Sequence, residues 1–211
     1  MKKYQKYLAE VFGTFVFVFV GTAVAYTTGE ILLVAMAFPL VVLMMIFTIG
    51  EISGAQLNPA VSLGLLLDKR ITGKEFVLYV LSQLVGGLLG SGLLALLVGS
   101  TSNLATNQVQ SLDNNLLAIL VEAVITAIFV FVVLKVTSKE NTNKFAGFVI
   151  PLALFAMILV GFNFSSGSLN PARSLAPALL EGGTGLNQVW IFIVGPFIGS
   201  GLGALLFKSF K

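Results

Sequence analysis

Leu57-Asn58-Pro59-Ala60 and Leu169-Asn170-Pro171-Ala172 are two copies of one short pattern, and they lie 112 residues apart. Asparagine at a helix N-cap and proline at the first helical position favour the start of a helix. Helix-compatible runs follow the two copies, at 61–67 and at 173–180. One copy in a soluble protein would predict only a helix start, but two copies raise the question whether the whole chain is duplicated.

The composition of the chain is that of a membrane protein. Of its 211 residues, 57% are hydrophobic and only 10% are charged, and the mean hydropathy is +1.00. A soluble domain has about 25% charged residues. Because cysteine and histidine are absent, we predict no disulfide, no metal site, no cofactor and no enzymatic activity. The net charge of +3 does not indicate nucleic-acid binding, because the basic residues follow the membrane topology.

Apolar runs of about 20 residues predict six membrane spans in a single domain, 1–211. We place the spans at about 7–26, 31–49, 76–98, 116–136, 145–162 and 189–207. Polar re-entrant stretches with short helices occupy 50–68, between spans 2 and 3, and 163–180, between spans 5 and 6.

Lysine and arginine are distributed asymmetrically around these spans. Eleven of the twelve basic residues lie before span 1, between spans 2 and 3, between spans 4 and 5, or after span 6. The positive-inside rule assigns that side to the cytoplasm. We therefore predict a multi-pass protein of the cell (plasma or bacterial inner) membrane with both termini in the cytoplasm. The exception is Arg173, which follows the second Asn-Pro-Ala and has a plain alternative role as a lipid-headgroup contact.

Other segments repeat with the motif. The run that begins at Glu10 matches the run that begins at Glu122, again 112 residues apart. Gly90-Ser91-Gly92-Leu93 matches Gly199-Ser200-Gly201-Leu202 at an offset of 109. Each half, 1–98 and 116–211, holds three spans, so the second half must enter the membrane from the opposite side. The sequence therefore predicts an inverted repeat.

This inversion gives the motif a physical role. The short helices cannot cross about 30 Å of hydrocarbon at 1.5 Å per residue, so they reach only part-way in. Irregular backbone at that depth must be buried in protein or line a water-filled cavity. Entering from opposite faces, the two helix N-termini meet with their positive dipole ends, beside the amide donors of Asn58 and Asn170. Such a centre opposes cations and admits neutral molecules that offer an acceptor oxygen.

Several motifs together resemble the aquaporin, or major intrinsic protein, family. They are the duplicated Asn-Pro-Ala, the Ala-Glu-x-x-Gly-Thr opening at 9–14, Arg173 and Gly195-Pro196. The resemblance covers essentially the whole chain. It implies an all-α membrane protein with six transmembrane helices and two re-entrant half-helices in an inverted repeat, one pore per subunit, and a homotetramer in membrane lipid. It implies that the pore motifs are Asn58, Pro59, Ala60, Asn170, Pro171 and Ala172.

The resemblance also implies four positions for the narrowest constriction: Phe38, Ile158, Gly167 and Arg173. Water-selective members usually carry histidine where this chain has Ile158, which is apolar and cannot donate. Gly167 removes a side chain and exposes a backbone carbonyl. We expect both positions to widen the constriction and make it less polar. Glycerol facilitators generally have aspartate after the arginine, where this chain has Ser174.

We therefore predict a passive channel for water whose filter also admits small uncharged solutes such as glycerol and urea, and excludes ions and protons. A glycerol-facilitator-type channel, with water secondary, is the alternative. Inverted repeats and broken helices also occur in secondary active transporters, whose transport depends on an ion gradient. A non-conducting structural protein would form tetramers without permeability.

Four acidic or amide residues and a group of glycines leave alternatives open. Glu10 and Glu122 are either a proton relay or loop-supporting carboxylates that accept bonds from re-entrant N–H groups, and the resemblance implies the second role. Glu51 and Gln56 lie where family members often carry histidine, so gating through them is not implied. We expect Glu51 to be a solvated vestibule residue. The glycines of spans 3 and 6 predict close helix packing, either inside one subunit or between subunits.

Overall fold

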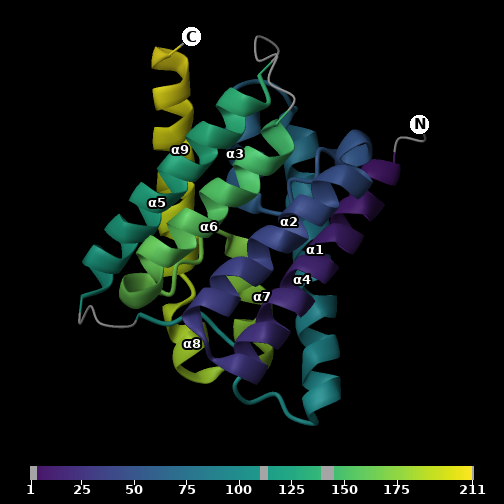
Figure 1. Cartoon of the computed structure of the whole chain (residues 1–211), viewed down its shortest axis with the longest axis vertical. Helices are drawn as coiled ribbons and strands as arrows, with labels where there is room; N and C mark the ends of the chain where they lie inside the picture. The colour runs from purple at the N-terminus through teal and green to yellow at the C-terminus, as the bar shows by residue number, and fades with distance from the viewer. Residues whose placement is uncertain (1–3, 110–113, 139–144, 211) are drawn as a thin grey trace.

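The computed structural model describes residues 4–109, 114–138 and 145–210, and within these ranges the chain forms helices and connecting segments without a strand (Figure 1). The helices are α1 (Gln5–Thr28), α2 (Ile31–Ser53), α3 (Pro59–Leu67), α4 (Gly73–Val98), α5 (Asn115–Val136), α6 (Ala146–Ser165), α7 (Pro171–Glu181), α8 (Gly183–Gln188) and α9 (Ile191–Ser209).

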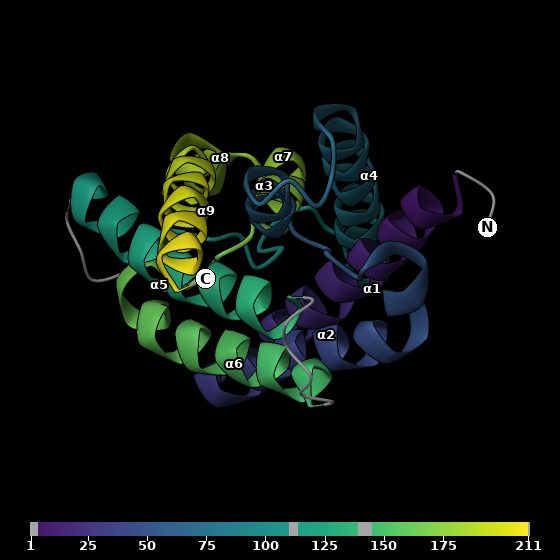
Figure 2. The same cartoon turned by 90° about the horizontal axis from the view of Figure 1, so that it is seen from above.

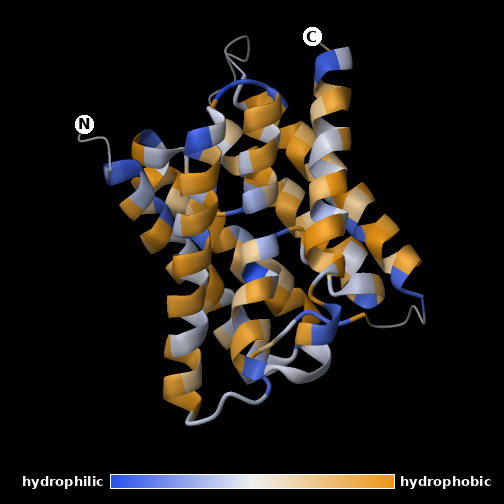
Figure 3. Ribbon diagram, turned by 180° about the vertical axis from the view of Figure 1, so that it is seen from behind, coloured by the Kyte–Doolittle hydropathy of each residue, from blue (hydrophilic) through white to orange (hydrophobic). Residues whose placement is uncertain are grey.

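The lengths of these helices confirm the predicted all-α membrane fold. Five helices, α1, α2, α4, α5 and α6, and the stretch Gly183–Ser209, which joins α8 to α9, are long and apolar enough to cross a membrane. In contrast, α3 has 9 residues and α7 has 11, so they rise only about 14–17 Å, roughly half of the hydrocarbon thickness. Hydrophobic residues dominate the long helices, and hydrophilic residues gather toward their ends (Figure 3).

The differences from the predicted spans include an earlier start of one long helix and an additional short helix. Helix α4 begins at Gly73 rather than near residue 76, because Thr72 and Glu75 form a capping box. The Thr72 side chain accepts from the Glu75 N–H, and the Glu75 carboxylate accepts from the Thr72 N–H at 2.8 Å, which satisfies two helix-terminal donors. The short helix α8, which precedes α9, was not predicted from the sequence.

The same helix contacts recur in the two halves of the chain. Helix α1 packs on α4 and α2, and α5 packs on α9 and α6 in the same way. Each half-helix contacts the last long helix of the other half, α3 against α9 and α7 against α4. Viewed from above, α3 and α7 lie one over the other in the middle of the bundle (Figure 2), and they contact each other.

Glycines allow the closest of these helix contacts. A Cβ at Gly90 would lie 2.7 Å from the carbonyl oxygen of Phe15 in α1, and one at Gly199 would meet the backbone carbonyl of Ala123 in α5. Any larger residue at these positions would push the helix pairs apart. Gly90 and Gly199 thus allow close packing of helices within one chain. For these two residues, the packing inside a subunit is one of the two alternatives that the sequence left open.

Candidate functional site

The two Asn-Pro-Ala stretches begin α3 and α7 in the same way. The side-chain oxygen of Asn58 accepts from the Ala60 N–H at 2.8 Å, and that of Asn170 accepts from the Ala172 N–H at 3.0 Å. Proline follows at the first helical position in both helices. Both asparagines are therefore N-caps, and their oxygens are turned toward their own helices.

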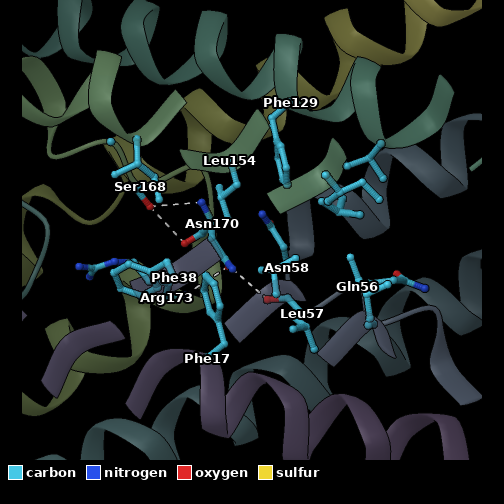
Figure 4. Close-up of a pocket in the computed structure, with 18 of the residues that line it drawn as sticks. Phe17, Phe38, Gln56, Leu57, Asn58, Phe129, Leu154, Ser168, Asn170 and Arg173 are labelled. Carbon is cyan, nitrogen blue, oxygen red and sulfur yellow. Dashed lines mark hydrogen bonds between the residues drawn. The ribbon is translucent and has the colours of Figure 1, made fainter. Parts of the chain in front are cut away.

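The amide nitrogens of the two asparagines link the halves. Asn58 Nδ2 donates to the carbonyl of Leu169 at 2.9 Å, and Asn170 Nδ2 donates to the carbonyl of Leu57 at 2.9 Å. Each nitrogen carries two N–H bonds, so one remains for the space between the half-helices. The crossed bonds hold the two N-termini against each other, and Figure 4 shows the bond from Asn170 toward Leu57.

The buried carboxylates hold the backbone that leads into each half-helix. Glu10 accepts from the Ser53 hydroxyl at 2.7 Å and from the N–H groups of Gln56 and Leu57 at 2.9 and 2.8 Å. Glu122 makes the equivalent bonds in the second half, with the Ser165 hydroxyl at 2.8 Å and with the N–H groups of Ser168 and Leu169, both at 2.9 Å. Both carboxylates are fully buried, and neither is among the residues that line the central cavity.

A cavity of about 310 Å³ runs past both asparagines. At the end of the bundle where the two termini lie, Arg70 and Thr137 line it; at the other end it is lined by the segment 105–107. Its walls come from both halves and include all four predicted constriction residues, Phe38, Ile158, Gly167 and Arg173.

Arg173 and Phe38 lie together in the wall of this cavity. The guanidinium carbon of Arg173 is 5.1 Å from the centre of the Phe38 ring, which is within the range of a cation–π contact. Arg173 Nη1 donates to the carbonyl of Ala105 at 3.0 Å. Arg173 is only 7% exposed, so it lies inside the protein and is not a headgroup contact. The guanidinium can donate to a passing oxygen and repel a cation.

The packing at Gly167 corrects one expectation. Gly167 has a positive φ of 55°, and a Cβ there would lie 2.8 Å from the carbonyl oxygen of Ile158 and 3.2 Å from the Phe162 nitrogen. The side chain that this glycine lacks would thus meet the backbone of α6 rather than project into the cavity. The absent side chain therefore lets the loop approach α6, and it does not widen the constriction in the way that we expected from the sequence.

The segment between α4 and α5 contributes residues that the sequence analysis missed. The Leu104 N–H donates to the Glu181 carboxylate at 2.7 Å and the Gln108 N–H to the Ser166 hydroxyl at 3.2 Å. These bonds fasten the segment over the cavity mouth, where the Ala105 carbonyl meets Arg173. The signal that could have indicated this role is its polar composition without lysine or arginine.

Asn107 is the second contribution of this segment. Its Oδ1 accepts from the Ser174 hydroxyl at 2.9 Å, and it is 2% exposed. Among the residues that the structure describes, its Nδ2 has no hydrogen-bond partner. Asn107 also lines the cavity, while its unpaired Nδ2 is itself buried behind the cavity wall.

At the opposite mouth, Gln56, Glu51 and Arg70 have different environments. Gln56 lines the cavity and accepts from the Ser62 hydroxyl at 2.6 Å. Glu51 is exposed and does not belong to the cavity wall. Arg70, which sequence reasoning did not single out as a site residue, donates to Asp68, to the Thr137 hydroxyl and to the carbonyl of Leu134, each at 2.7 Å. It thereby ties the end of α3 to the end of α5.

Within the described ranges, no group of three or more acidic side chains is arranged to hold a metal ion. Membrane-length helices surround two half-helices that contact each other beside a cavity, and this arrangement is that of a polytopic membrane channel.

Comparison with known proteins gives the family. Residues 1–207 match the model of the major intrinsic protein family, and the chain belongs to that family, whose members compared here are channels and not enzymes. It is 38% identical to glycerol uptake facilitator protein-like 6 of Lactiplantibacillus plantarum, over 95% of both chains. It is 36% identical to aquaporin Z of Photorhabdus laumondii, over 97% of this chain and 98% of the relative. Its fold matches the aquaglyceroporin structure from Plasmodium falciparum with a TM-score of 0.86 at 24% identity, over 97% and 95% of the two chains.

Proposed function

We propose that this protein is a passive channel for water whose filter also admits small uncharged solutes of the size of glycerol and urea. The observation that carries the proposal is the cavity that passes Asn58, Asn170 and Arg173. The names of the relatives, aquaporin Z and a glycerol uptake facilitator, support both parts of it.

Exclusion of ions and protons follows from the centre of the cavity. The N-termini of α3 and α7 carry positive partial charge, about half an elementary charge each, and the two N-cap asparagines hold them face to face. A cation that enters must give up its water against this field, whereas a neutral molecule offers an oxygen to the amide donors. Arg173 adds a full positive charge at one end.

Admission of solutes follows from the two kinds of wall at the constriction. Phe38 and Ile158 form an apolar side, and Arg173 provides donors near the Ala105 carbonyl. A small polyol can lay its carbon chain on the apolar side and its hydroxyls on the polar side. A histidine at position 158 would replace part of the apolar wall with a donor and reduce the space.

The remaining roles belong to the same proposal. Glu10 and Glu122 support the re-entrant loops, and 1–98 and 116–211 are the two inverted repeats. We place both termini in the cytoplasm of a cell with the chain in its plasma or inner membrane, because of the distribution of basic residues. Four subunits associate in the membrane, and the exposed apolar residues on the outer faces of α2 and α6 provide surface for neighbouring subunits and lipid; they include Leu40, Phe47 and Leu152.

Stopped-flow light scattering on proteoliposomes tests the proposal. Vesicles with the protein are expected to shrink faster than empty vesicles in an impermeant osmolyte, and to re-swell in glycerol and urea. The flux should not change when a proton or sodium gradient is imposed. Ile158→His is expected to slow re-swelling in glycerol while water flow persists. Vesicles that shrink no faster than empty ones contradict the channel, and unchanged glycerol flux through Ile158→His contradicts the role of Ile158.

A further inference from the structure

The ring of Phe38 lies between Arg173 and helix α1, and α1 meets it with two residues one turn apart. The Phe17 ring is 4.9 Å from the Phe38 ring, at an angle of 55° between their planes. Gly21 follows Phe17 by four positions and therefore shares its face of α1. Around a Cβ built on Gly21, the three nearest atoms would all belong to the Phe38 ring and would overlap it.

We propose that Phe17 and Gly21 form a seat for Phe38, and that this seat sets how far the aromatic side of the filter reaches into the pore. Gly21 is a positioning residue, because it acts through Phe38, whereas Phe17 supports the Phe38 ring and also lines the cavity itself. The inference rests on the proposed role of Phe38 and Arg173 as filter residues.

The direction of the effect follows from the packing around the ring. Phe38 is 3% exposed and Phe17 is 4% exposed, so on the side toward α1 the Phe38 ring is closely packed. The opposite side of Phe38 faces the Arg173 guanidinium and the cavity (Figure 4). A group that displaces the ring from α1 therefore moves it toward Arg173 and narrows the pore.

The absence of a side chain at Gly21 gives the pore its width on this side. Carbon atoms in contact lie about 3.5–4.0 Å apart, so a methyl group at this position would displace the ring by roughly 1 Å or more. Such a shift is comparable to the difference in size between water and a small polyol. The glycine of α1, which lies behind the filter, thus becomes a determinant of solute selection.

Gly21→Ala tests the seat in proteoliposomes, with water and glycerol permeability measured on the same preparation. We expect the ratio of glycerol to water permeability to fall about tenfold, equivalent to about 1.4 kcal/mol added to the barrier. Gly92→Ala is the matched control, because a Cβ at Gly92 has no atom within 4 Å, and it should leave the ratio unchanged.

Two further variants separate the seat from a general packing defect. Gly21→Ala combined with Phe38→Leu removes the ring that the methyl group overlaps, and glycerol permeability should return. Phe17→Leu removes the aromatic contact on α1, which lets Phe38 settle toward α1 and raises the ratio.

The results for these variants distinguish a failure of the proposed seat from a failure of the proposed solute permeability. An unchanged ratio in Gly21→Ala, or no recovery in the double variant, overturns the seat. If the unmodified channel passes no glycerol, the solute part of the proposed function fails. The seat is then tested by water permeability, which Gly21→Ala should lower and the double variant with Phe38→Leu should restore. If Gly21→Ala does not fold, recovery of folding in the double variant supports the seat, and failure of both variants overturns it.

Discussion

Replacement of Glu122 by glutamine tests how the second re-entrant loop is held. One carboxylate oxygen accepts from the Ser165 hydroxyl and the Ser168 N–H, and the other accepts from the Leu169 N–H. Glutamine keeps one oxygen acceptor and presents N–H donors where the other oxygen was. In Glu122→Gln the side-chain NH₂ group therefore points at a backbone N–H, so that two hydrogen-bond donors face each other and neither has an acceptor.

The cost of this change can be worked out from the bonds. A hydrogen bond to a charged group contributes about 1.5–3 kcal/mol, and a buried donor left unpaired costs about 1–3 kcal/mol. Glu122→Gln leaves one N–H unpaired and weakens two charge-assisted bonds, so we expect the free energy of unfolding to fall by about 3–5 kcal/mol. The fall for Glu10→Gln should be at least as large, because Glu10 also accepts from Gln83 Nε2 at 2.8 Å.

Equilibrium unfolding in mixed micelles, followed by circular dichroism, measures this loss. The control is Glu51→Gln, the same change on an exposed carboxylate, which should alter stability by no more than about 0.5 kcal/mol. Water permeability per folded channel is measured beside it. If Glu122→Gln were as stable as the unmodified protein and instead abolished a proton-coupled flux, the loop-supporting role would be refuted in favour of a proton relay.

Three other predictions concern the two mouths of the pore. Arg173→Ala removes the charge beside Phe38, so potassium or proton leakage through liposomes should rise; a channel that stays tight to ions would contradict the barrier assigned to Arg173. Asn107→Leu removes the acceptor of the Ser174 hydroxyl and a buried amide at nearly equal volume. Because the cavity wall loses a polar group, glycerol flux should fall more than water flux in the stopped-flow assay, whereas equal falls would point to distortion alone. Arg70→Met removes the hydrogen bonds from Arg70 to Asp68, after α3, and to Thr137 and Leu134, at the end of α5. The free energy of unfolding should fall by roughly 1–2 kcal/mol, and the channel should still exclude ions.

The spans and half-helices could be predicted because their signals are local. Apolar runs of membrane length mark the long helices, and Asn58-Pro59 and Asn170-Pro171 mark the starts of α3 and α7. The N-cap bonds of both asparagines join residues only two or three positions apart, so the motif already specifies them. The capping box that starts α4 early, at Thr72 and Glu75, was equally local but was not used.

The finer determinants of the pore could not be predicted because they depend on contacts between distant segments. Gly167 was expected to open the constriction, but whether a missing side chain widens a pore depends on where its Cβ would point, and here it points at α6. Gly21 lies in α1 and Phe38 lies in α2. Because both helices are apolar on all sides, their sequences do not show which face of one packs against the other. The bonds of Ala105 and Asn107 arise from an irregular segment that has no periodic pattern to read.

Equivalent positions of the two halves carry different side chains, which is consistent with the filter that we propose at one end of the pore. Gln56 and Ser168 occupy equivalent positions, 112 residues apart, and so do Ser62 and Ser174. In the first half, the long Gln56 side chain reaches Ser62 and accepts its hydroxyl at 2.6 Å. In the second half, the shorter Ser168 shares a hydrogen bond with the Ser174 hydroxyl, and the Ser174 hydroxyl donates to Asn107 Oδ1 of the connecting segment at 2.9 Å. The connecting segment meets Arg173 at this mouth. The two halves, which are joined at the centre by matching asparagine bonds, therefore differ at their mouths, and the filter that we propose lies at the mouth with Asn107 and Arg173.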